Sequence, residues 1–448
     1  MKAFKAYDIR GVWNQDFHPE DVYRIGFYLP RLLNTRTILV GRDVRTSSPE
    51  IFEALTQGIT EAGADVDDIG LATTPLVYWA TAKYGYRASV QITASHNAAP
   101  YNGLKISRED AQPVGYDSGL RQLQEMIQQK PVPVSPKGCV RERPLYAPYM
   151  DFLATYQTDL SNLKISMDLS NGMAALFARK LFGDQVQYLF ETLDGSFPNH
   201  APNPLNPENI LPLQAHVKAH HSDIGVIFDG DADRVMFVDE QGAFISPDLM
   251  IAVLGHHFLK GNTKAKVLQD IRTSKAVGEY LVPKGAEMTM WRVGRAYAAL
   301  KLREIDGLFG GELAGHYYFK DFYYSDSGLM AALLLLGIFA EEKRQGTTVS
   351  QLIKRISHYH NSGEINFKIA QKQEAMEAVV AHFRTQTPPS ALYDFDGYRL
   401  EYPGWWLNIR PSNTEPYLRF LCEAKEEHTL KDIISQVRAI IEKMGGAS

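Results

Sequence analysis

Val40-Gly-Arg-Asp-Val-Arg-Thr-Ser-Ser48 follows an apolar run at residues 37–40 and precedes a helical pattern over residues 49–62. The same order of strand, aspartate, polar turn and helix occurs at Val267-Leu-Gln-Asp-Ile-Arg-Thr-Ser-Lys275. A weaker copy stands at Ile165-Ser-Met-Asp-Leu-Ser-Asn-Gly172. Three copies of one strand–turn–helix start predict three related α/β domains. Chance similarity between short turns is the alternative, and the weak middle copy leaves it open.

The composition is that of a globular protein with several cores. A chain of 448 residues is too long for one core, and usual domain sizes predict three or four domains. Apolar residues make up 45% of the chain and charged residues 22%, which is ordinary for a globular protein. The net charge of -5 gives no basic footprint, so nucleic acid is not an expected partner. Cys139 and Cys422 lie too far apart to form a metal or redox motif.

The ends of the chain and its linkers suggest where the domains begin. The N-terminal residues lack the apolar run of a signal peptide, and no stretch is long enough to cross a membrane, so we expect a cytoplasmic protein. Pro131-Val-Pro-Val-Ser-Pro136 precedes a boundary near residue 150, and a polar run at residues 358–364 precedes the last one. The predicted domains are residues 1–150, 151–250, 251–365 and 366–448, and a helix over residues 430–444 ends the last, which has an α+β pattern.

The first loop with chemical potential is Thr93-Ala-Ser-His-Asn97. It follows an apolar run at residues 88–92, which predicts a strand, and precedes Pro100-Tyr-Asn-Gly103, which predicts a turn. The Ser95 hydroxyl could attack an acyl or phosphoryl centre, with His96 and Lys105 stabilising the developing charge. The alternative is a polar turn that caps the next element.

The second loop is Asp229-Gly-Asp-Ala-Asp-Arg234, which follows the buried-strand pattern of residues 224–228. Alternate aspartates in a tight loop can converge on a hard divalent cation such as Mg²⁺. An EF-hand fits poorly, because Arg234 stands where the loop needs glycine and a strand pattern follows. An aspartyl-phosphate phosphatase with Asp229 as nucleophile is a further alternative.

Two more loops carry candidate ligands. In Gly310-Gly-Glu-Leu-Ala-Gly-His316, Glu312 either accepts hydrogen bonds from sugar hydroxyls or is a turn carboxylate, and His316 is either catalytic or a core histidine. Arg410-Pro-Ser-Asn-Thr414 offers a guanidinium, hydroxyls and amides that suit a phosphate, or it forms a turn before a helix. Ligands of α/β sheets bind at the carboxyl ends of strands, so these loops predict a shared cleft.

Together the motifs Thr93-Ala-Ser-His-Asn97, Asp229-Gly-Asp-Ala-Asp-Arg234, Gly311-Glu-Leu-Ala-Gly315 and Arg410-Pro-Ser-Asn-Thr-Glu-Pro416 resemble the α-D-phosphohexomutase family, in order and over the whole chain. The opening of the chain and Gly315-His-Tyr-Tyr-Phe319 are most similar to its phosphomannomutase branch. The resemblance implies an α/β fold with four domains around a central cleft. Three domains would be related, with mixed sheets, and the smaller C-terminal α+β domain would move.

The resemblance also implies roles for the loop residues. Ser95 would carry a phosphoryl group, and Asp229, Asp231 and Asp233 would hold Mg²⁺ with a phosphoserine oxygen of residue 95 as a further ligand. Glu312 would read sugar hydroxyls. The phosphate that does not react would be bound by Arg410, Ser412, Asn413 and Thr414. The family positions close to the transferring phosphoryl group or the sugar are Tyr7, Arg10, His96, Lys105, Arg234 and His316.

The implied reaction interconverts mannose 6-phosphate and mannose 1-phosphate, with glucose phosphates as further substrates. Phosphoserine gives its phosphoryl group to the free hydroxyl, and the hexose 1,6-bisphosphate turns over in the cleft and returns its other phosphate. Lys105, Arg10 and His316 are the candidates for general acid and base, without a ranking. The resemblance further implies hexose phosphates as the partners, a monomer or weak homodimer, and a place in GDP-mannose biosynthesis. A Mg²⁺-dependent sugar phosphatase, a glucosamine phosphate mutase and a silent sugar-phosphate binding protein remain alternatives.

Three positions depart from the family pattern. Ala314 stands where a serine is usual, and losing one hydrogen bond costs about 0.5 to 1.5 kcal/mol. Arg295, in Arg292-Val-Gly-Arg295, stands where many relatives have histidine, and a guanidinium does not titrate near neutrality. Ala98 replaces a proline, which predicts a less rigid serine loop.

Overall fold

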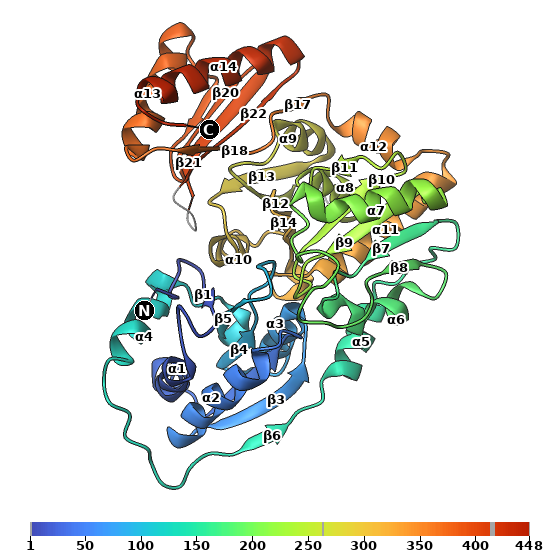
Figure 1. Cartoon of the computed structure of the whole chain (residues 1–448). Coiled ribbons are helices and arrows are strands. Elements are labelled where there is room, and N and C mark those ends of the chain that lie inside the picture. Colours follow the sequence, from blue (N-terminus) through green and yellow to red (C-terminus); the bar gives the residue numbers. More distant parts are fainter. Residues whose placement is uncertain (1, 262–263, 413–416, 448) are drawn as a thin grey trace.

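The computed structural model describes residues 2–261, 264–412 and 417–447. The chain forms four successive units, each built on one sheet, as the colour sequence in Figure 1 shows. None of the described helices is both long and apolar enough to span a bilayer.

The first sheet has the order β1-β5-β4-β2-β3-β6. Its neighbours pair in parallel except that β5 is antiparallel to β4 and β1, so the sheet is mixed. The strands are β1 (Ile9–Val12), β2 (Thr37–Arg42), β3 (Asp65–Leu71), β4 (Ala88–Ile92), β5 (Tyr101–Arg108) and β6 (Val140–Glu142). The helices are α1 (Pro19–Leu32), α2 (Ser48–Glu61), α3 (Thr74–Lys83) and α4 (Arg121–Met126).

Helices α1 and α2 cross at two glycines. A Cβ at Gly58 would lie 2.0 Å from the carbonyl oxygen of Tyr23, and one at Gly26 would lie 2.2 Å from that of Leu55. Real Cβ atoms do not approach backbone that closely, so larger residues at both positions would force the helices apart. Helix α2 stops before Gly63, whose φ of 83° is unfavourable for other residues.

The second and third units repeat a parallel core with antiparallel additions. The second sheet, β11-β10-β9-β7-β8, consists of β7 (Ile165–Asp168), β8 (Gln187–Leu189), β9 (Ile224–Phe228), β10 (Val235–Asp239) and β11 (Phe244–Ile245). The third, β13-β12-β14-β15-β16, consists of β12 (Ala265–Asp270), β13 (Ala286–Trp291), β14 (Phe309–Gly311), β15 (Tyr317–Phe319) and β16 (Ser325–Asp326). Their helices are α5 (Tyr146–Ala154), α6 (Ala178–Phe182), α7 (Pro207–His220), α8 (Leu249–Phe258), α9 (Lys275–Leu281), α10 (Arg295–Glu304), α11 (Gly328–Arg344) and α12 (Val349–Ile356).

The fourth unit is antiparallel throughout. Its strands follow the order β17-β22-β21-β20-β19, and β18 also pairs with β22. They are β17 (His360–Asn361), β18 (Ile365–Lys368), β19 (Ala391–Tyr393), β20 (Tyr398–Tyr402), β21 (Trp405–Pro411) and β22 (Tyr417–Ala424), with helices α13 (Lys372–Gln386) and α14 (Glu427–Lys443). This is the α+β pattern predicted for the end of the chain.

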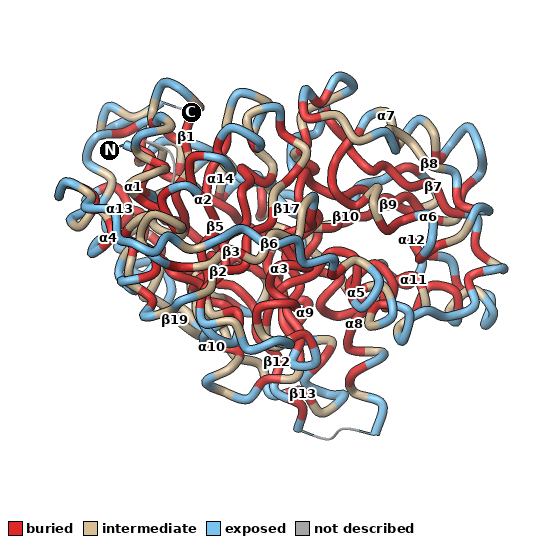
Figure 2. The backbone as a smooth tube through the Cα atoms, turned by 90° about the horizontal axis from the view of Figure 1, so that it is seen from below, coloured by how far each residue is buried: buried red, intermediate tan, exposed pale blue. Residues whose placement is uncertain are grey.

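The hydrophobic cores join three of the units and leave the fourth separate. One cluster runs from α3 of the first unit through the second and third, and the fourth unit has a cluster of its own. Helix α11 lies in the joint cluster and is buried on nearly every face from Gly328 to Ala340. Figure 2 colours buried residues red, and red predominates through the interior of the molecule. The strands that flank residues 229–234 and 310–316 belong to this joint cluster, whereas β4 and β5, which flank the serine loop, pack in a further cluster within the first unit.

The three copies of the sequence repeat form the same local structure. Asp43 directly follows β2, and Asp168 and Asp270 are the last residues of β7 and β12. Each accepts a hydrogen bond from the backbone N–H two residues later, at 3.0, 2.8 and 2.6 Å. This contact is an Asx-turn, in which the carboxylate replaces a backbone acceptor. The repeat is therefore a structural one and not a chance similarity.

Two local predictions were wrong. The turn expected at residues 100–103 ends at Pro100, because β5 begins at Tyr101 and Gly103 pairs with Arg10 of β1. A Cβ at Gly103 would lie 2.2 Å from the carbonyl oxygen of Ile9, so this glycine permits close strand approach and not a turn. Arg410 lies within β21, where a loop was expected.

Candidate active site

The serine loop is fixed by a buried arginine from the β2 turn. Ser95 is 1% exposed and has a φ of 51°, a left-handed conformation that side chains other than glycine adopt at a cost. Arg45 donates to the carbonyl oxygens of Ser95, Asn97, Ala98 and Tyr101 at 2.8, 2.6, 2.9 and 3.0 Å. These four contacts hold the loop in its strained form.

The aspartate loop joins β9 to β10 and is buried from Asp229 to Asp233. Carboxylate oxygens of Asp229, Asp231 and Asp233 all lie within 4.8 Å of one another. Burial, together with the charges of Asp231 and Asp233, raises the pKa of Asp229 well above its usual value. One oxygen each of Asp231 and Asp233 is buried without a hydrogen bond. Three converging carboxylates with unused oxygens are the ligand set that a hard divalent cation requires.

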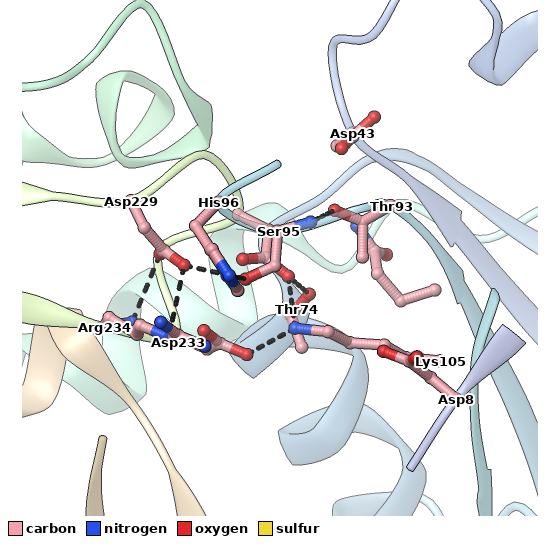
Figure 3. Close-up of polar contacts among 12 residues, drawn as sticks. Asp8, Asp43, Thr74, Thr93, Ser95, His96, Lys105, Asp229, Asp233 and Arg234 are labelled. Carbon is pink, nitrogen blue, oxygen red and sulfur yellow. Dashed lines mark hydrogen bonds and ion pairs between the residues drawn. The ribbon is translucent and has the colours of Figure 1, made fainter. Parts of the chain in front are cut away.

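The serine and aspartate loops touch directly. The Ser95 hydroxyl donates to Asp229 Oδ2 at 2.8 Å (Figure 3). A Cβ at residue 230 would lie 2.5 Å from the carbonyl oxygen of Ser95, so Gly230 is what lets the loops meet. Thr74, at the start of α3, donates its hydroxyl to Asp231 Oδ2 and its backbone N–H to the Asp231 carbonyl.

Lys105 brings a cation into the aspartate loop. Its Nζ donates to Asp231 Oδ2 at 2.7 Å and to Asp233 Oδ2 at 2.5 Å. Burial alone would lower the pKa of Lys105, but the two carboxylates reverse that effect and raise it. Lys105 is therefore held as a charged ammonium.

A second charged group lies on the other side of the loop and links the second unit to the third. Arg234 Nε donates to His316 Nε2 at 2.9 Å and lies 3.8 Å from Asp229 Oδ2. His316 Nδ1 lies 2.6 Å from Asp326 Oδ2, and Arg295 Nε donates to Asp326 Oδ1 at 3.0 Å. These side chains come from two loops, strand β16 and helix α10, yet form one continuous network.

Glu312 lies in the third loop, between β14 and β15. Tyr318 donates its hydroxyl to Glu312 Oε1 at 2.6 Å, and the N–H of Gly294 donates to Oε2 at 3.2 Å. Burial raises the pKa of Glu312. Asp270 supports the loop by accepting the N–H of Leu313 at 2.9 Å and pairs with Arg272, which lies 3.8 Å from Glu312 Oε2. This carboxylate is thus held by two donors beside a guanidinium.

The residues predicted to bind the remote phosphate lie in the fourth unit. Arg410 is 3% exposed, and its Nε and Nη1 atoms are buried without a hydrogen-bond partner. Burial and the neighbouring charge of Arg272 lower the pKa of Arg410. Donors that are buried and unpaired are costly, and an anionic ligand would satisfy them. Asn413 and Thr414 lie outside the described residues.

The sequence is similar to known proteins over its whole length. Four family models match in chain order, described as phosphoglucomutase/phosphomannomutase domain I at residues 1–131, domain II at 147–242, domain III at 246–359 and the C-terminal domain at 364–440. A phosphomannomutase of Escherichia coli K12 is 35% identical over 446 residues, covering 96% of this chain and 97% of that protein. The chain belongs to the phosphoglucomutase/phosphomannomutase family. It is therefore an enzyme, an isomerase that transfers a phosphoryl group within its substrate.

Other members of this family show how widely the likeness extends. A phosphomannomutase of Methanocaldococcus jannaschii is 32% identical, covering 99% of this chain and 98% of that protein. The crystal structure of a phosphoglucomutase/phosphomannomutase family protein from Burkholderia thailandensis superposes with a TM-score of 0.87 at 28% identity, covering 99% of this chain and 98% of that one. The predicted four-domain α/β fold is confirmed.

Most of the predicted site residues of this phosphohexomutase meet at one place. The residues in contact around the serine are Lys105, Asp229, Asp231, Asp233, Arg234 and His316. His96 Nδ1 lies 3.4 Å from Ser95 Oγ, and burial with the charges of Arg234 and Arg10 holds the pKa of His96 well below its usual value. Arg10 donates to Asn97 Oδ1 at 2.9 Å.

Other predicted residues lie further along the mutase site. The Tyr7 hydroxyl donates to the carbonyl of Val293 at 3.0 Å and so lies beside the Arg292–Arg295 stretch. The N–H of Ser412 bonds to the carbonyl oxygen of Tyr417 at 2.9 Å. Arg410 lies with Arg272, in the region of Glu312.

Several residues that contact the predicted site residues were not singled out from the sequence. Thr74 had only the signal of a helix start, and its partner Asp231 is 157 residues away. Asp326 lies in a polar stretch before α11 and gave no motif of its own. Arg45 was quoted as part of the repeat, yet nothing in the sequence indicates that its guanidinium reaches the serine loop.

Proposed function

We propose that the protein is a phosphomannomutase that interconverts mannose 6-phosphate and mannose 1-phosphate through a phosphoserine at residue 95, with glucose phosphates as further substrates. The observation that carries the proposal is the buried Ser95 hydroxyl, 2.8 Å from Asp229 Oδ2 at the edge of three convergent carboxylates. Relatives named phosphomannomutase support the choice of hexose. In the cell the product would supply GDP-mannose synthesis in the cytoplasm, and a monomer or weak homodimer stays our prediction.

The metal ligands in this proposal are Asp229, Asp231 and Asp233, joined by an oxygen of phosphorylated Ser95. The unpaired oxygens of Asp231 and Asp233 fit a bound Mg²⁺, since buried carboxylate oxygens need a partner. A second group of Asp233, His316 and Asp326 is also compact, but His316 and Asp326 already bond each other. When bound, Mg²⁺ would offset the negative charge that develops on the transferring phosphoryl oxygens.

The protein's own residues would place and move the protons. In the first half-reaction the bond between phosphorus and Ser95 Oγ breaks as a bond forms from phosphorus to the sugar oxygen. The sugar hydroxyl loses its proton to His316 Nε2, and Ser95 Oγ gains one from Lys105 Nζ. The second half-reaction reverses both transfers on the other end of the sugar. Glu312 would orient the sugar hydroxyls.

Arg410 and Ser412, with Asn413 and Thr414, would bind the phosphate that is not reacting. The unpaired Nε and Nη1 atoms of Arg410 support this role, because a phosphate accepts several charge-assisted hydrogen bonds. The bisphosphate must turn within the site, so the fourth unit would have to loosen and close again in each cycle. Its separate hydrophobic core is consistent with such movement.

Phosphorus NMR tests the proposal. The protein is incubated with Mg²⁺, a trace of the matching hexose 1,6-bisphosphate, and mannose 1-phosphate or glucose 1-phosphate in parallel. Growth of a 6-phosphate signal is expected, faster with mannose. Release of free phosphate would identify a phosphatase, and no change in either sample would point to a different sugar or to a binding protein. Ser95→Ala should lose turnover by orders of magnitude while retaining sugar-phosphate binding, and Asp231→Asn should weaken activity and Mg²⁺ dependence together. Wild-type turnover in Ser95→Ala would refute the phosphoserine.

A further inference from the structure

We infer that Asp326 is a positioning residue that holds His316 in the tautomer with a free Nε2 lone pair, and that Arg295 fixes Asp326 for this task. The inference deepens the proposed function, because it states how His316 would serve as the proton acceptor for the sugar hydroxyl. The catalytic role of Asp326 rests on the proposed function, whereas the tautomer of His316 follows from the contacts alone.

The partner of His316 Nδ1 is a carboxylate. His316 Nδ1 lies 2.6 Å from Asp326 Oδ2, and both side chains are buried. An ionised carboxylate only accepts hydrogen bonds, so Nδ1 must carry the proton. Asp233 Oδ1 is 3.8 Å from the same nitrogen, beyond hydrogen-bond distance. Asp326 is therefore the partner that decides which nitrogen is protonated.

The partner of His316 Nε2 is a guanidinium. Arg234 Nε donates to His316 Nε2 at 2.9 Å, and a guanidinium has no acceptor to offer. Nε2 must therefore present its lone pair. Two independent neighbours specify the same tautomer. In the reaction, an anionic sugar phosphate would compete for the Arg234 guanidinium and leave Nε2 to the sugar hydroxyl.

Arg295 explains why Asp326 holds its orientation. Arg295 Nε donates to Asp326 Oδ1 at 3.0 Å, so both carboxylate oxygens have a donor. The guanidinium carbon also lies 3.5 Å from the centre of the Tyr78 ring, and Nη2 donates to the Ala111 carbonyl at 3.3 Å. Because Tyr78 and Ala111 belong to the first unit, Arg295 ties Asp326 to the unit that carries Ser95.

This assignment gives a role to the residue that departs from the family pattern. Arg295 cannot act as an acid or base near neutral pH. It can, however, act through Asp326, since a fixed charge at Oδ1 stabilises the carboxylate facing the histidine. After Nε2 takes the proton of the sugar hydroxyl, the ring is an imidazolium that donates from Nδ1 to Asp326, and the sugar oxygen keeps the electron pair that bonds to phosphorus.

The network predicts a specific defect in Asp326→Asn. An amide has one oxygen and one NH₂ group, whereas both Arg295 and His316 Nδ1–H need an acceptor. If the oxygen faces Arg295, the NH₂ group faces Nδ1 and forces the proton to Nε2, where it opposes Arg234. If the oxygen faces His316, the NH₂ group opposes Arg295. Arg234 can turn toward Asp229 Oδ2, 3.8 Å away, whereas Arg295 is held by Tyr78 and Ala111, so we expect the first arrangement and a switched tautomer.

The test combines kinetics with nitrogen NMR of histidine-labelled, full-length protein. Wild-type His316, assigned by its loss in His316→Gln, should show a protonated Nδ1 and a bare Nε2, and Asp326→Asn should show the opposite. With mannose 1-phosphate, the kcat of Asp326→Asn should fall about 10²- to 10⁴-fold while KM changes less than about threefold. Arg295→Lys, which keeps the charge but loses the stack on Tyr78, should change kcat in the same direction by less.

A matched control and the contrary outcomes complete the design. Asp239→Asn replaces another buried aspartate, at the end of β10, and should leave kcat and the His316 signals unchanged. A wild-type His316 with the proton on Nε2, or unaltered kcat in both Asp326→Asn and Arg295→Lys, would overturn the inference. Wild-type protein without mutase turnover would instead overturn the proposed function, and the NMR result would still decide the tautomer.

Discussion

The β2 turn and the β12 turn share the sequence Asp-x-Arg-Thr-Ser and differ in what they support. In each, the aspartate accepts the N–H of the arginine and pairs with its guanidinium, Asp43 with Arg45 at 3.1 Å and Asp270 with Arg272 at 2.8 Å. The Nη1 and Nη2 atoms of Arg45 donate hydrogen bonds to four carbonyls of the serine loop. Arg272 instead lies beside Glu312 and Arg410.

The carbonyls of the two turns are also used differently. Those of Ile271 and Thr273, in the β12 turn, accept hydrogen bonds from Arg399 of the fourth unit at 2.8 and 2.6 Å. Ser274 donates to Glu423 of the same unit at 2.6 Å. One repeated turn thus holds a loop of its own unit, and the other anchors a neighbouring unit. The lesson is that a turn's sequence specifies its shape, whereas its neighbours decide its task.

The largest expected effect comes from breaking the β2 turn. Arg45→Met leaves the buried Asp43 without its counter-charge and four carbonyls without their donor. We expect the free energy of unfolding to fall by about 3 to 5 kcal/mol, with mutase activity lost as well. Urea unfolding measures this, and a loss below about 1 kcal/mol would show that the serine loop does not depend on Arg45.

The corresponding change in the β12 turn should affect the ligand more than the fold. Arg272→Lys keeps the charge next to Asp270 but loses the planar guanidinium facing Glu312. We expect kcat/KM to fall about 10-fold while the unfolding free energy changes by less than about 1 kcal/mol. Steady-state kinetics and unfolding on the same sample would test this prediction. A lower free energy of unfolding with unchanged kcat/KM would contradict the contrast with Arg45.

The anchorage of the fourth unit should depend on pH. Burial and the charge of Asp248 raise the pKa of Glu423 from 4.5 to about 7. Between these values the folded protein keeps a proton that the unfolded chain has lost, so this contribution is full below pH 4.5 and is lost as pH rises to about 7. Glu423→Gln should remove that part of the slope in unfolding measurements between pH 4.5 and 7. Parallel curves for the two proteins would refute it.

The smallest expected effect is tighter substrate binding at the Glu312 loop, which the β12 turn supports. Ala314→Ser adds a hydroxyl beside Leu313, whose N–H bonds to Asp270. One added hydrogen bond to substrate is worth about 0.5 to 1.5 kcal/mol, which corresponds to a KM lower by about 2- to 10-fold. Kinetics with mannose 1-phosphate would show it, and an unchanged KM would mean that residue 314 does not face the ligand.

The features predicted correctly are those specified by residues that are close together in the sequence. The strands at residues 88–92 and 224–228 were correct because apolar runs decide buried strands, and the aspartate loop was recognisable because its three carboxylates alternate within five residues. Arg399 could not be found, because its contacts with the β12 turn join residues 126 and 128 apart. Gly103 was misread as a turn residue, since the close strand that requires glycine is remote in sequence.

The ion pair between Lys105 and Asp231 has a consequence during protein synthesis. The two residues are separated by 126 positions, and ribosomes add about 5 to 20 residues per second, so Lys105 waits about 6 to 25 s for its partner. Over that interval the first unit can fold around Arg45, but Lys105 lacks the carboxylates of Asp231 and Asp233 that it pairs with in the complete chain. The nascent chain is then open to premature capture by anions or chaperones. Slow translation between these two residues would lengthen the exposure, so the messenger sequence there bears on the yield of active enzyme.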